Sequence, residues 1–316
     1  MDFIESIKNF PKQLSFEPII ENGDKIKPFK RLIFVGMGGS ALGPDLLRIL
    51  RPDLDIWIHR DYDLPSLPDS AFNESLVVLN SYSGNTIEVL TAFEEATKRG
   101  LNMAAVSIGG RLLELAKNFG APHIQMTDME TQPRLALGLN LKAIFKLIGD
   151  EDLLRKFESI NLDYLKYENA GNEIANEIKG SIPIVYSSRE NGPLSYVWKV
   201  VLNETVKIPA FSNVFPELNH NEMAGFESAE LSKDFYYIFL RDSFDRPDIS
   251  KRMDATLKVI SGRDLRVRII ELEGSDKPEK VLNSLILAYW AGYYLAKNLG
   301  VDPEGIKIIE DFKKAL

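Results

Sequence analysis

Short runs of consecutive apolar residues alternate with longer amphipathic stretches along the first half of the chain. Continuous apolar runs predict buried strands of a parallel sheet, and the stretches between them predict helices that cover the sheet. The predicted strands are 32–35, 55–58, 76–80, 103–107 and 122–125, and the predicted helices are 41–50, 86–98 and 111–119. This alternation is typical of βαβ units in an α/β domain.

A mainly helical region from 133 to about 180, with a possible break at 169–172, separates this series from a second one. The second series has predicted strands at 182–186, 207–209, 235–240 and 266–272, and predicted helices at 193–204, 245–260 and 278–298. Two such series predict two tandem, doubly wound αβα sandwich domains with mainly parallel sheets. We place these domains at residues 1–155 and 156–316. The apolar stretch 282–296 is shorter than the ~18–20 residues that span a bilayer, so we expect a buried core helix there.

Composition removes several classes of function. The 316 residues include 46 acidic and 38 basic side chains, a net charge of −8 that offers no general basic surface to nucleic acid or anionic lipid. The absence of cysteine excludes disulfides, thiolate metal sites and a cysteine nucleophile. Three histidines lie far apart without metal-ligand spacing, so we predict no metal site. The first residues lack the pattern of an export signal, and we expect a cytoplasmic protein.

The first candidate ligand loop is GMGGSA, residues 36–41, between a predicted strand and a predicted helix. Glycines let backbone amides approach a ligand closely, and a helix N-terminus attracts an anion. The loop also fits the relaxed G-x-G-x-x-A dinucleotide fingerprint, with Asp61 near the end of the next unit. This motif alone therefore leaves a dinucleotide site, another phosphate site and a ligand-free tight turn open.

The second candidate loop is SYSGNT, residues 81–86, again between a predicted strand and a predicted helix. Three hydroxyls and a glycine at a helix N-terminus suit a phosphate monoester held by neutral donors. Simple capping of the helix by Ser83 or Thr86 is the alternative. Because both loops follow strands of one parallel sheet, they predict a single sugar-phosphate-sized site at its carboxyl edge.

These two loops resemble those of the sugar isomerase (SIS) domain, whose fold is a doubly wound αβα sandwich. In that family the second loop binds the phosphate of a phosphosugar. The resemblance implies phosphate contacts at the hydroxyl positions and close-approach glycines in the first loop. The implied phosphate-binding residues are Gly38, Gly39, Ser40, Ser81, Ser83 and Thr86.

Three further residues suggest the chemistry of an aldose–ketose isomerisation, which needs a proton-transfer base and groups that open the sugar ring and stabilise an enediolate. Glu204 borders an apolar helical stripe that could raise its pKa, although a solvated surface glutamate fits the same pattern. His220 lies in the polar turn PELNHNE, where an imidazole could exchange a proton with the ring oxygen or serve only as a cap or surface residue. Arg134 follows Pro133 at the predicted first turn of a helix, where a cation opposes the helix dipole.

The segments LNE (202–204), PELNHNE (216–222) and QPR (132–134) resemble one branch of the SIS superfamily, the bifunctional phosphoglucose/phosphomannose isomerases. This likeness implies Glu204 as the base, His220 as the ring-opening group and Arg134 as the enediolate stabiliser. It also implies an active-site lysine at Lys313, with the neighbouring Lys314 as the alternative register. Family members need no metal or cofactor and act as homodimers in which the histidine reaches the partner's site.

The expected activity is therefore interconversion of glucose 6-phosphate and mannose 6-phosphate with fructose 6-phosphate through a cis-enediol. The family's use of mannose 6-phosphate is attributed partly to a small threonine near the C-terminus, and residues 301–316 contain no threonine. The alternatives are another SIS phosphosugar isomerase, a non-catalytic phosphosugar sensor and a dinucleotide-binding oxidoreductase. Sensors of this superfamily usually carry a DNA-binding domain, and the first ~30 residues are too few and too acidic for one.

Overall fold

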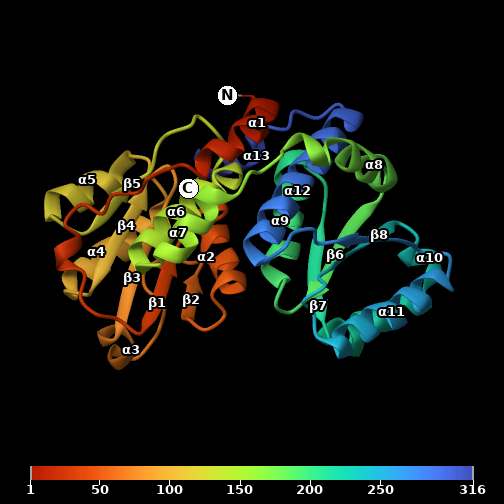
Figure 1. Ribbon diagram of the computed structural model, residues 1–316, viewed down its shortest axis with the longest axis horizontal. Helices are drawn as coiled ribbons and strands as arrows, with labels where there is room; N and C mark the ends of the chain where they lie inside the picture. The colour runs from red at the N-terminus through yellow and green to blue at the C-terminus, as the bar shows by residue number, and fades with distance from the viewer. Residues whose placement is uncertain (1, 315–316) are drawn as a thin grey trace. The chain divides into compact units, whose positions relative to one another are not determined.

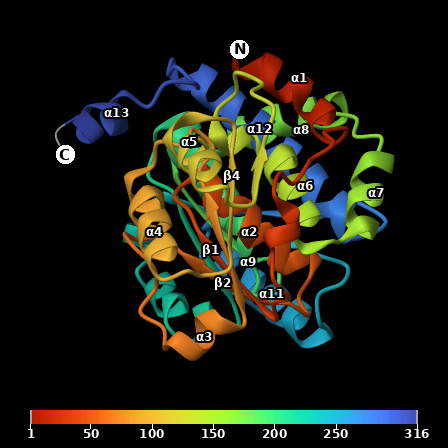
Figure 2. The ribbon, with the colours of Figure 1, turned by 90° about the vertical axis from the view of Figure 1, so that its left-hand side faces the viewer.

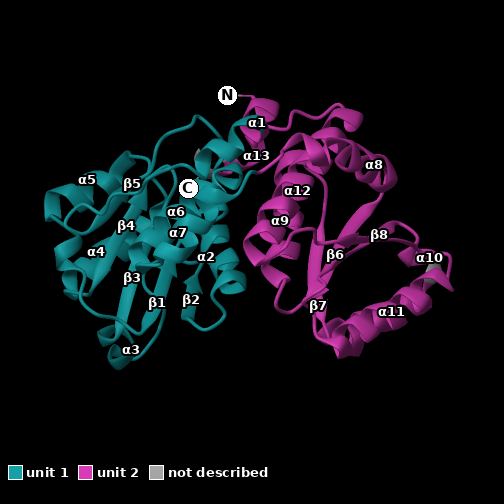
Figure 3. Cartoon of the chain, in the orientation of Figure 1, with its two compact units in different colours: residues 1, 8–161 teal, residues 2–7, 162–316 magenta. Residues whose placement is uncertain are grey.

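The computed structural model describes residues 2–314, which form two compact units (Figures 1 and 3). Residues 8–161 make up the first unit, and residues 2–7 with the chain from Leu162 onward make up the second. Helix α1 (Phe3–Gln13) contributes to both. The expected domain boundary between residues 155 and 156 falls inside helix α7 (Glu151–Ser159), whereas the two units divide after Asn161.

The first unit is built on a five-stranded parallel sheet with the strand order β2-β1-β3-β4-β5. Its strands are β1 (Arg31–Val35), β2 (Asp55–His59), β3 (Ser75–Asn80), β4 (Met103–Ser107) and β5 (His123–Gln125). Its helices are η1 (Gly23–Lys25), α2 (Gly39–Leu50), α3 (Asp69–Asn73), α4 (Ile87–Lys98), α5 (Gly110–Phe119), η2 (Pro133–Leu135), α6 (Leu137–Ile148) and α7. All five strands predicted for this half of the chain are confirmed; the apolar runs of β1, β3 and β4 are buried on both faces, whereas β2 at the edge of the sheet has one buried residue.

Both faces of this sheet are covered by helices. Alternate strand residues such as Ile33, Val77 and Ala105 pack with Val89 and Phe93 of α4 in one apolar core. Figure 2 shows α4 on one side of the sheet and α6 and α7 on the other. The first unit is therefore the predicted three-layer αβα sandwich.

The second unit has a four-stranded parallel sheet with the strand order β7-β6-β8-β9. Its strands are β6 (Ile182–Ser188), β7 (Phe211–Phe215), β8 (Phe235–Arg241) and β9 (Arg266–Glu271). Its helices are η3 (Leu165–Tyr167), α8 (Glu168–Ile178), α9 (Gly192–Val201), η4 (Leu202–Val206), η5 (Glu217–His220), η6 (Glu222–Glu227), α10 (Ala229–Ser232), α11 (Pro247–Ser261), α12 (Lys277–Leu299) and α13 (Lys307–Lys314). The predicted core helix is the largely buried α12, and no helix within residues 2–314 is long and apolar enough to cross a bilayer.

Two local predictions in this region are wrong. The strand predicted at 207–209 lies instead at β7, because Lys207 adopts a left-handed conformation (φ 61°) and Pro209 has no N–H for a strand ladder. The possible break at 169–172 lies inside the continuous helix α8. Gly171 is there for close packing, since a Cβ on it would lie 2.5 Å from the Cβ of Trp290 on α12.

Candidate active site

The strand order places both predicted phosphate loops at the centre of the first sheet. In an order 2-1-3-4-5, the chain leaves β1 and β3 in opposite directions, and ligands bind at this switch point beside the carboxyl ends of the strands. Residues 36–38 connect β1 to α2, and residues 81–86 connect β3 to α4. Neither helix has a side-chain hydrogen bond at its N-cap. Two helix N-termini therefore meet one edge with their positive ends uncapped by side chains.

The two loops are joined by a hydrogen bond. The hydroxyl of Ser40, at the start of α2, accepts a 2.8 Å hydrogen bond from the backbone N–H of Tyr82. A serine hydroxyl that accepts this bond keeps its own proton for donation to a ligand. Ser40 thus ties the glycine loop to the hydroxyl loop, as a single site requires.

Two of the three hydroxyls in the second loop pair with each other, and none of them caps the helix. The Oγ of Ser81 and the Oγ1 of Thr86 lie 2.8 Å apart, and the N–H of Gly84 donates to Ser81 Oγ at 3.1 Å. Ser83 is exposed, and its hydroxyl accepts a 3.3 Å bond from the N–H of Asn85. Because Thr86 is the N-cap residue of α4 yet makes no capping bond, the capping alternative is wrong for its hydroxyl.

A third loop, residues 108–109 between β4 and α5, contacts residues 81–86 and fixes their conformation; the sequence analysis did not predict this contact. Gly84 adopts a left-handed conformation (φ 72°), and a Cβ on it would lie 1.9 Å from the carbonyl oxygen of Gly109. The N–H of Ile108 donates to the carbonyl of Tyr82 at 3.0 Å.

The side chain of Tyr82 carries no charge. Burial raises the pKa of Tyr82 to about 12, with a smaller contribution from Asp128, so its neutral phenol adds no negative charge to an anion site.

A buried pair of asparagine side chains, which the sequence analysis did not predict, lies under the two phosphate loops and holds the first of them in place. Asn80 and Asn140 exchange hydrogen bonds of 3.1 and 2.9 Å, and Asn80 also donates to the carbonyl of Ser40 at 2.8 Å. Gly43 makes room for the pair, since a Cβ there would lie 2.0 Å from the Oδ1 of Asn140. The only sequence signal was an asparagine at the end of an otherwise apolar strand.

Arg134 lies against the same edge. A Cβ on Gly39 would lie 2.6 Å from the carbonyl carbon of Pro133 and 2.7 Å from the backbone nitrogen of Arg134. Gly39 therefore allows η2 to approach the start of α2, and Gly38 supplies a positive φ of 50° before it. Arg134 is 1% exposed, so it is not the solvated side chain that its place in the sequence also allowed. As predicted, it lies in the first turn of a helix, the short η2, which directly precedes α6.

The remaining predicted residues belong to the second unit. Glu204 lies in η4, a π-helical segment that continues α9, and such segments often occur at functional sites. Gly292 of α12 lies against this segment, because a Cβ on it would be 2.8 Å from Val201 and 3.5 Å from Thr205. Glu204 is partly exposed beside buried neighbours, as the apolar stripe predicted.

His220 is the last residue of η5 and is exposed. Lys313 and Lys314 lie in α13, but their side chains are outside the part of the chain that the structure describes. The predicted site residues thus divide between the units: the phosphate loops and Arg134 belong to the first, and Glu204, His220 and Lys313 belong to the second. Among residues 2–314, no group of three histidine, aspartate or glutamate side chains could hold a metal ion.

Comparison with known proteins decides the family. The chain is 34% identical over 318 aligned residues to a bifunctional phosphoglucose/phosphomannose isomerase of Aquifex aeolicus, covering 98% of this chain and 97% of the relative. The chain belongs to the bifunctional phosphoglucose/phosphomannose isomerase family. A relative with the same name from Thermoplasma volcanium is 30% identical over the full length of both chains. Residues 167–316 also match the bacterial phospho-glucose isomerase C-terminal SIS domain family.

Solved structures support the same fold. The tagatose-6-phosphate ketose/aldose isomerase of Escherichia coli aligns with a TM-score of 0.68 over 96% of this chain and 95% of its own, at 16% identity. At this identity the likeness concerns the fold alone. The predicted fold, two SIS-type α/β domains with parallel sheets, is therefore confirmed.

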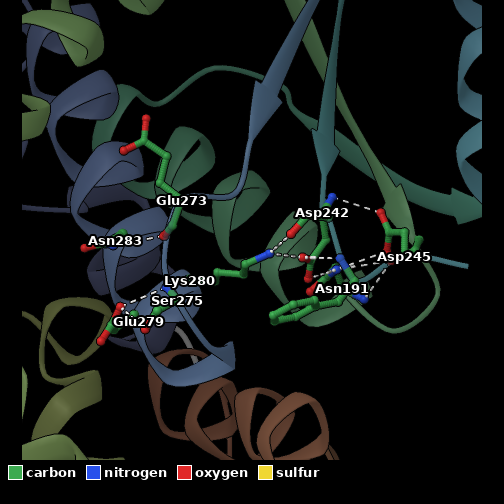
Figure 4. A network of polar contacts seen from close by, with 11 residues as sticks. Asn191, Asp242, Asp245, Glu273, Ser275, Glu279, Lys280 and Asn283 are labelled. Carbon is green, nitrogen blue, oxygen red and sulfur yellow. Dashed lines mark hydrogen bonds and ion pairs between the residues drawn. The ribbon is translucent and has the colours of Figure 1, made fainter.

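In this member of the phosphoglucose/phosphomannose isomerase family, the second sheet has different chemistry at its carboxyl edge (Figure 4). Lys280 of α12 is 2% exposed, forms an ion pair with Asp242 after β8 and lies 2.6 Å from the Oγ of Ser243. Asn191 before α9 donates to Asp242 at 3.1 Å and to Asp245 at 3.4 Å. Burial, the largest cause, raises the pKa of Asp245 above its ordinary value. This edge is filled by its own charged side chains.

Proposed function

We propose that this chain interconverts glucose 6-phosphate and mannose 6-phosphate with fructose 6-phosphate. The observation that carries the proposal is the full-length relationship to bifunctional isomerases combined with a hydroxyl-lined edge at the switch point of the first sheet. The hydroxyls of Ser40, Ser81, Ser83 and Thr86 and the uncapped N-termini of α2 and α4 would hold the phosphate. Gly38 and Gly39 shape the loop beneath it.

The proposed chemistry is a proton transfer through a cis-enediol. Glu204 removes the proton from C2 of the aldose phosphate and returns it to C1, while a hydroxyl proton passes from O2 to O1. The bonds balance without an oxidant or reductant. Arg134 would stabilise the negative charge on the enediolate oxygens, which is the largest electrostatic contribution expected in such a step. Lys313 would add a second cation.

Substrate sugars are mainly cyclic, so a group must first open the ring. We assign this step to His220, whose imidazole can give a proton to the ring oxygen near neutral pH. The proposal includes a homodimer in which His220 serves the site of the partner subunit. Its exposed position on η5 is compatible with that role.

The test is isomerisation of fructose 6-phosphate without added metal, with glucose 6-phosphate and mannose 6-phosphate quantified separately. Both products support the bifunctional assignment and mean that the threonine missing from residues 301–316 is dispensable. If glucose 6-phosphate is the only product, the enzyme does not use mannose 6-phosphate. If the folded protein forms neither product, the proposal is overturned.

The E204Q variant isolates the proposed base. It should lose at least ~100-fold in kcat, because general-base catalysis contributes about 10²–10⁴-fold, while phosphosugar binding persists. The matched control is E190Q, which neutralises an exposed carboxylate of the same unit and should retain wild-type turnover. Ordinary turnover in E204Q would refute the assignment of the base.

A further inference from the structure

The loop that carries His220 is fixed at both ends and in the middle by buried side chains. Phe215 before the loop and Phe226 near its end are buried, and so is Leu218, two residues before His220. Phe215 packs edge-on against Tyr186 of β6 with ring centroids 6.1 Å apart, and Phe226 packs against Tyr237 of β8 at 5.2 Å. These anchors all belong to one apolar core on a single face of the second sheet.

A polar clamp adds a second kind of attachment. Glu222, two residues after His220, accepts a 2.7 Å hydrogen bond from the hydroxyl of Tyr186 at its Oε2. Its Oε1 accepts a 2.6 Å bond from the side-chain amide of Asn213 on β7. Both carboxylate oxygens are thus held by two neighbouring strands, and hydrogen bonds to a carboxylate are stronger than those between neutral groups. We call Tyr186, Glu222 and Asn213 the Glu222 clamp.

The tyrosine donor in this clamp is a neutral phenol. Tyr186 is 1% exposed, and burial, reinforced by the neighbouring Glu222 carboxylate, holds the pKa of its phenol far above the usual range. The neutral phenol of Tyr186 is therefore the donor in its hydrogen bond to Glu222.

Asn219, on the other side of His220, is tied separately. Its amide donates a 2.8 Å hydrogen bond to the hydroxyl of Thr256 on α11. His220 stands between these two attachments, exposed, and forms no hydrogen bond or ion pair with any side chain that the structure describes. A backbone fixed on both sides of one unengaged imidazole is the arrangement expected when that imidazole must meet a ligand in a defined position.

We propose that the Glu222 clamp is the positioning device of His220, so that Tyr186, Asn213 and Glu222 contribute to ring opening without touching the sugar. This inference rests on the proposed ring-opening role of His220. Displacing a catalytic group by about 1 Å can cost on the order of 100-fold in rate, so loosening the loop should lower turnover. Phosphate binding is in the first unit and should be unaffected.

The kinetic test uses Y186F and E222Q. Y186F removes one donor without changing shape, and E222Q replaces one carboxylate oxygen with an amide nitrogen, which cannot accept a hydrogen bond from Tyr186 or Asn213. Each should lower kcat 5- to 50-fold for cyclic substrate and leave KM within twofold. The matched control is Y236F, because Tyr236 lies on neighbouring β8 and donates to Glu177 at 2.5 Å, a tyrosine–glutamate bond that does not involve this loop. Y236F should retain wild-type kcat.

A double-variant comparison separates positioning from general damage. In an H220A background, adding E222Q should cause no further loss beyond twofold, because the clamp acts only through His220. If E222Q lowers kcat equally in both backgrounds, or if Y186F and E222Q have wild-type kcat, the clamp proposal is overturned and the proposed isomerase function is not. If H220A itself has wild-type kcat, ring opening by His220 and the clamp are refuted together.

A spectroscopic readout does not depend on activity. The chain has three histidines, so the ring signal of His220 in a histidine-labelled sample is assigned by its loss in H220A. Y186F and E222Q should broaden or split that signal, whereas the signals of His59 and His123 and all three signals of Y236F stay sharp. An unchanged His220 signal in both clamp variants would contradict the proposal even if the chain proved to have another activity.

Discussion

The two sheets have the same strand order over their first four strands but opposite chemistry at their carboxyl edges. β6 and β8 occupy the places in the second sheet that β1 and β3 occupy in the first. After β3 comes Ser81, whose hydroxyl pairs with Thr86; after β8 comes Asp242, whose carboxylate pairs with Lys280. The helices at both edges lack side-chain caps, but the first edge presents neutral hydroxyls and the second is occupied by a buried ion pair.

This difference shows that the fold supplies the place for a ligand, while the residues in the loops decide whether a ligand can use it. A phosphate needs donors and positive helix ends that are not already neutralised. Asp242 and Asp245 would repel it, and the ammonium of Lys280, 3.9 Å from the ring centroid of Phe244, already takes the position of a counter-ion. The second edge therefore holds its own unit together, whereas the hydroxyls of the first edge suit the proposed phosphate site.

The largest effect is expected when the chemistry of the second edge is transplanted into the first. S81D places a carboxylate at the position that corresponds to Asp242 in the other unit, beside the proposed phosphate site. Like charges in contact cost several kcal/mol, so kcat/KM should fall roughly 1,000-fold, about 4 kcal/mol. The neutral control S81N has nearly the same size and should lose far less. Equal losses in S81D and S81N would show that shape, not charge, distinguishes the two edges.

Breaking the ion pair of the second edge should damage stability and not substrate binding. K280M leaves Asp242 buried without its cation, and breaking such a pair costs about 3–5 kcal/mol of unfolding free energy. Thermal or denaturant unfolding measures the loss, and KM for the phosphosugar should stay unchanged. Adding D242N to K280M removes the unpaired charge and should recover part of the stability. A raised KM in K280M would mean that the second edge also contributes to the substrate site.

Removing neutral donors from the first edge should weaken binding. S83A/T86A deletes two hydroxyls, and hydrogen bonds to charged groups contribute about 1.5–3 kcal/mol each, so KM should rise at least about 100-fold with a smaller change in kcat. S243A is the matched control, because it removes a hydroxyl at the corresponding edge of the second sheet. If KM is unchanged in S83A/T86A, the phosphate does not bind to this loop.

The smallest effect concerns pH. Asp245 has its pKa raised by burial, so the folded protein binds that proton more tightly than the unfolded chain does. Above the raised pKa the ionised carboxylate reduces stability, and this cost disappears as the pH falls through that pKa toward the ordinary value of 3.8. D245N should therefore be more stable than the wild type at pH 7, by less than the loss in K280M. The difference should shrink on acidification in thermal unfolding, and a difference that grows would contradict the assignment.

Much of the fold followed from the sequence because the buried strands are continuous apolar runs. β3, with six buried residues, left no alternative to a central strand. β7 was misplaced because it is a short strand with one fully buried residue, so its pattern is weak. Gly171 suggested a break in a helix although its lack of a side chain serves a contact with Trp290, far away in the sequence.

The candidate site was predicted where chemistry and local spacing coincide, and missed where it depends on distant contacts. The hydroxyls of residues 81–86 were visible as a motif. Asn140 and Gly109 were not, since each matters only because the fold brings it to Asn80 or Gly84. The roles of Glu204, His220, Arg134 and Lys313 came from family resemblance and stay predictions until they are measured.

The most direct test is a crystal structure with a bound open-chain aldonic acid phosphate, one carbon shorter than the substrate, whose carboxylate mimics the enediolate. We expect its phosphate within hydrogen-bond distance of Ser81, Ser83 or Thr86, and no ligand at the edge formed by Asn191, Asp242 and Lys280. A phosphate bound at the second edge, or one that makes no contact with residues 81–86, would refute the proposal that the first edge binds the substrate phosphate.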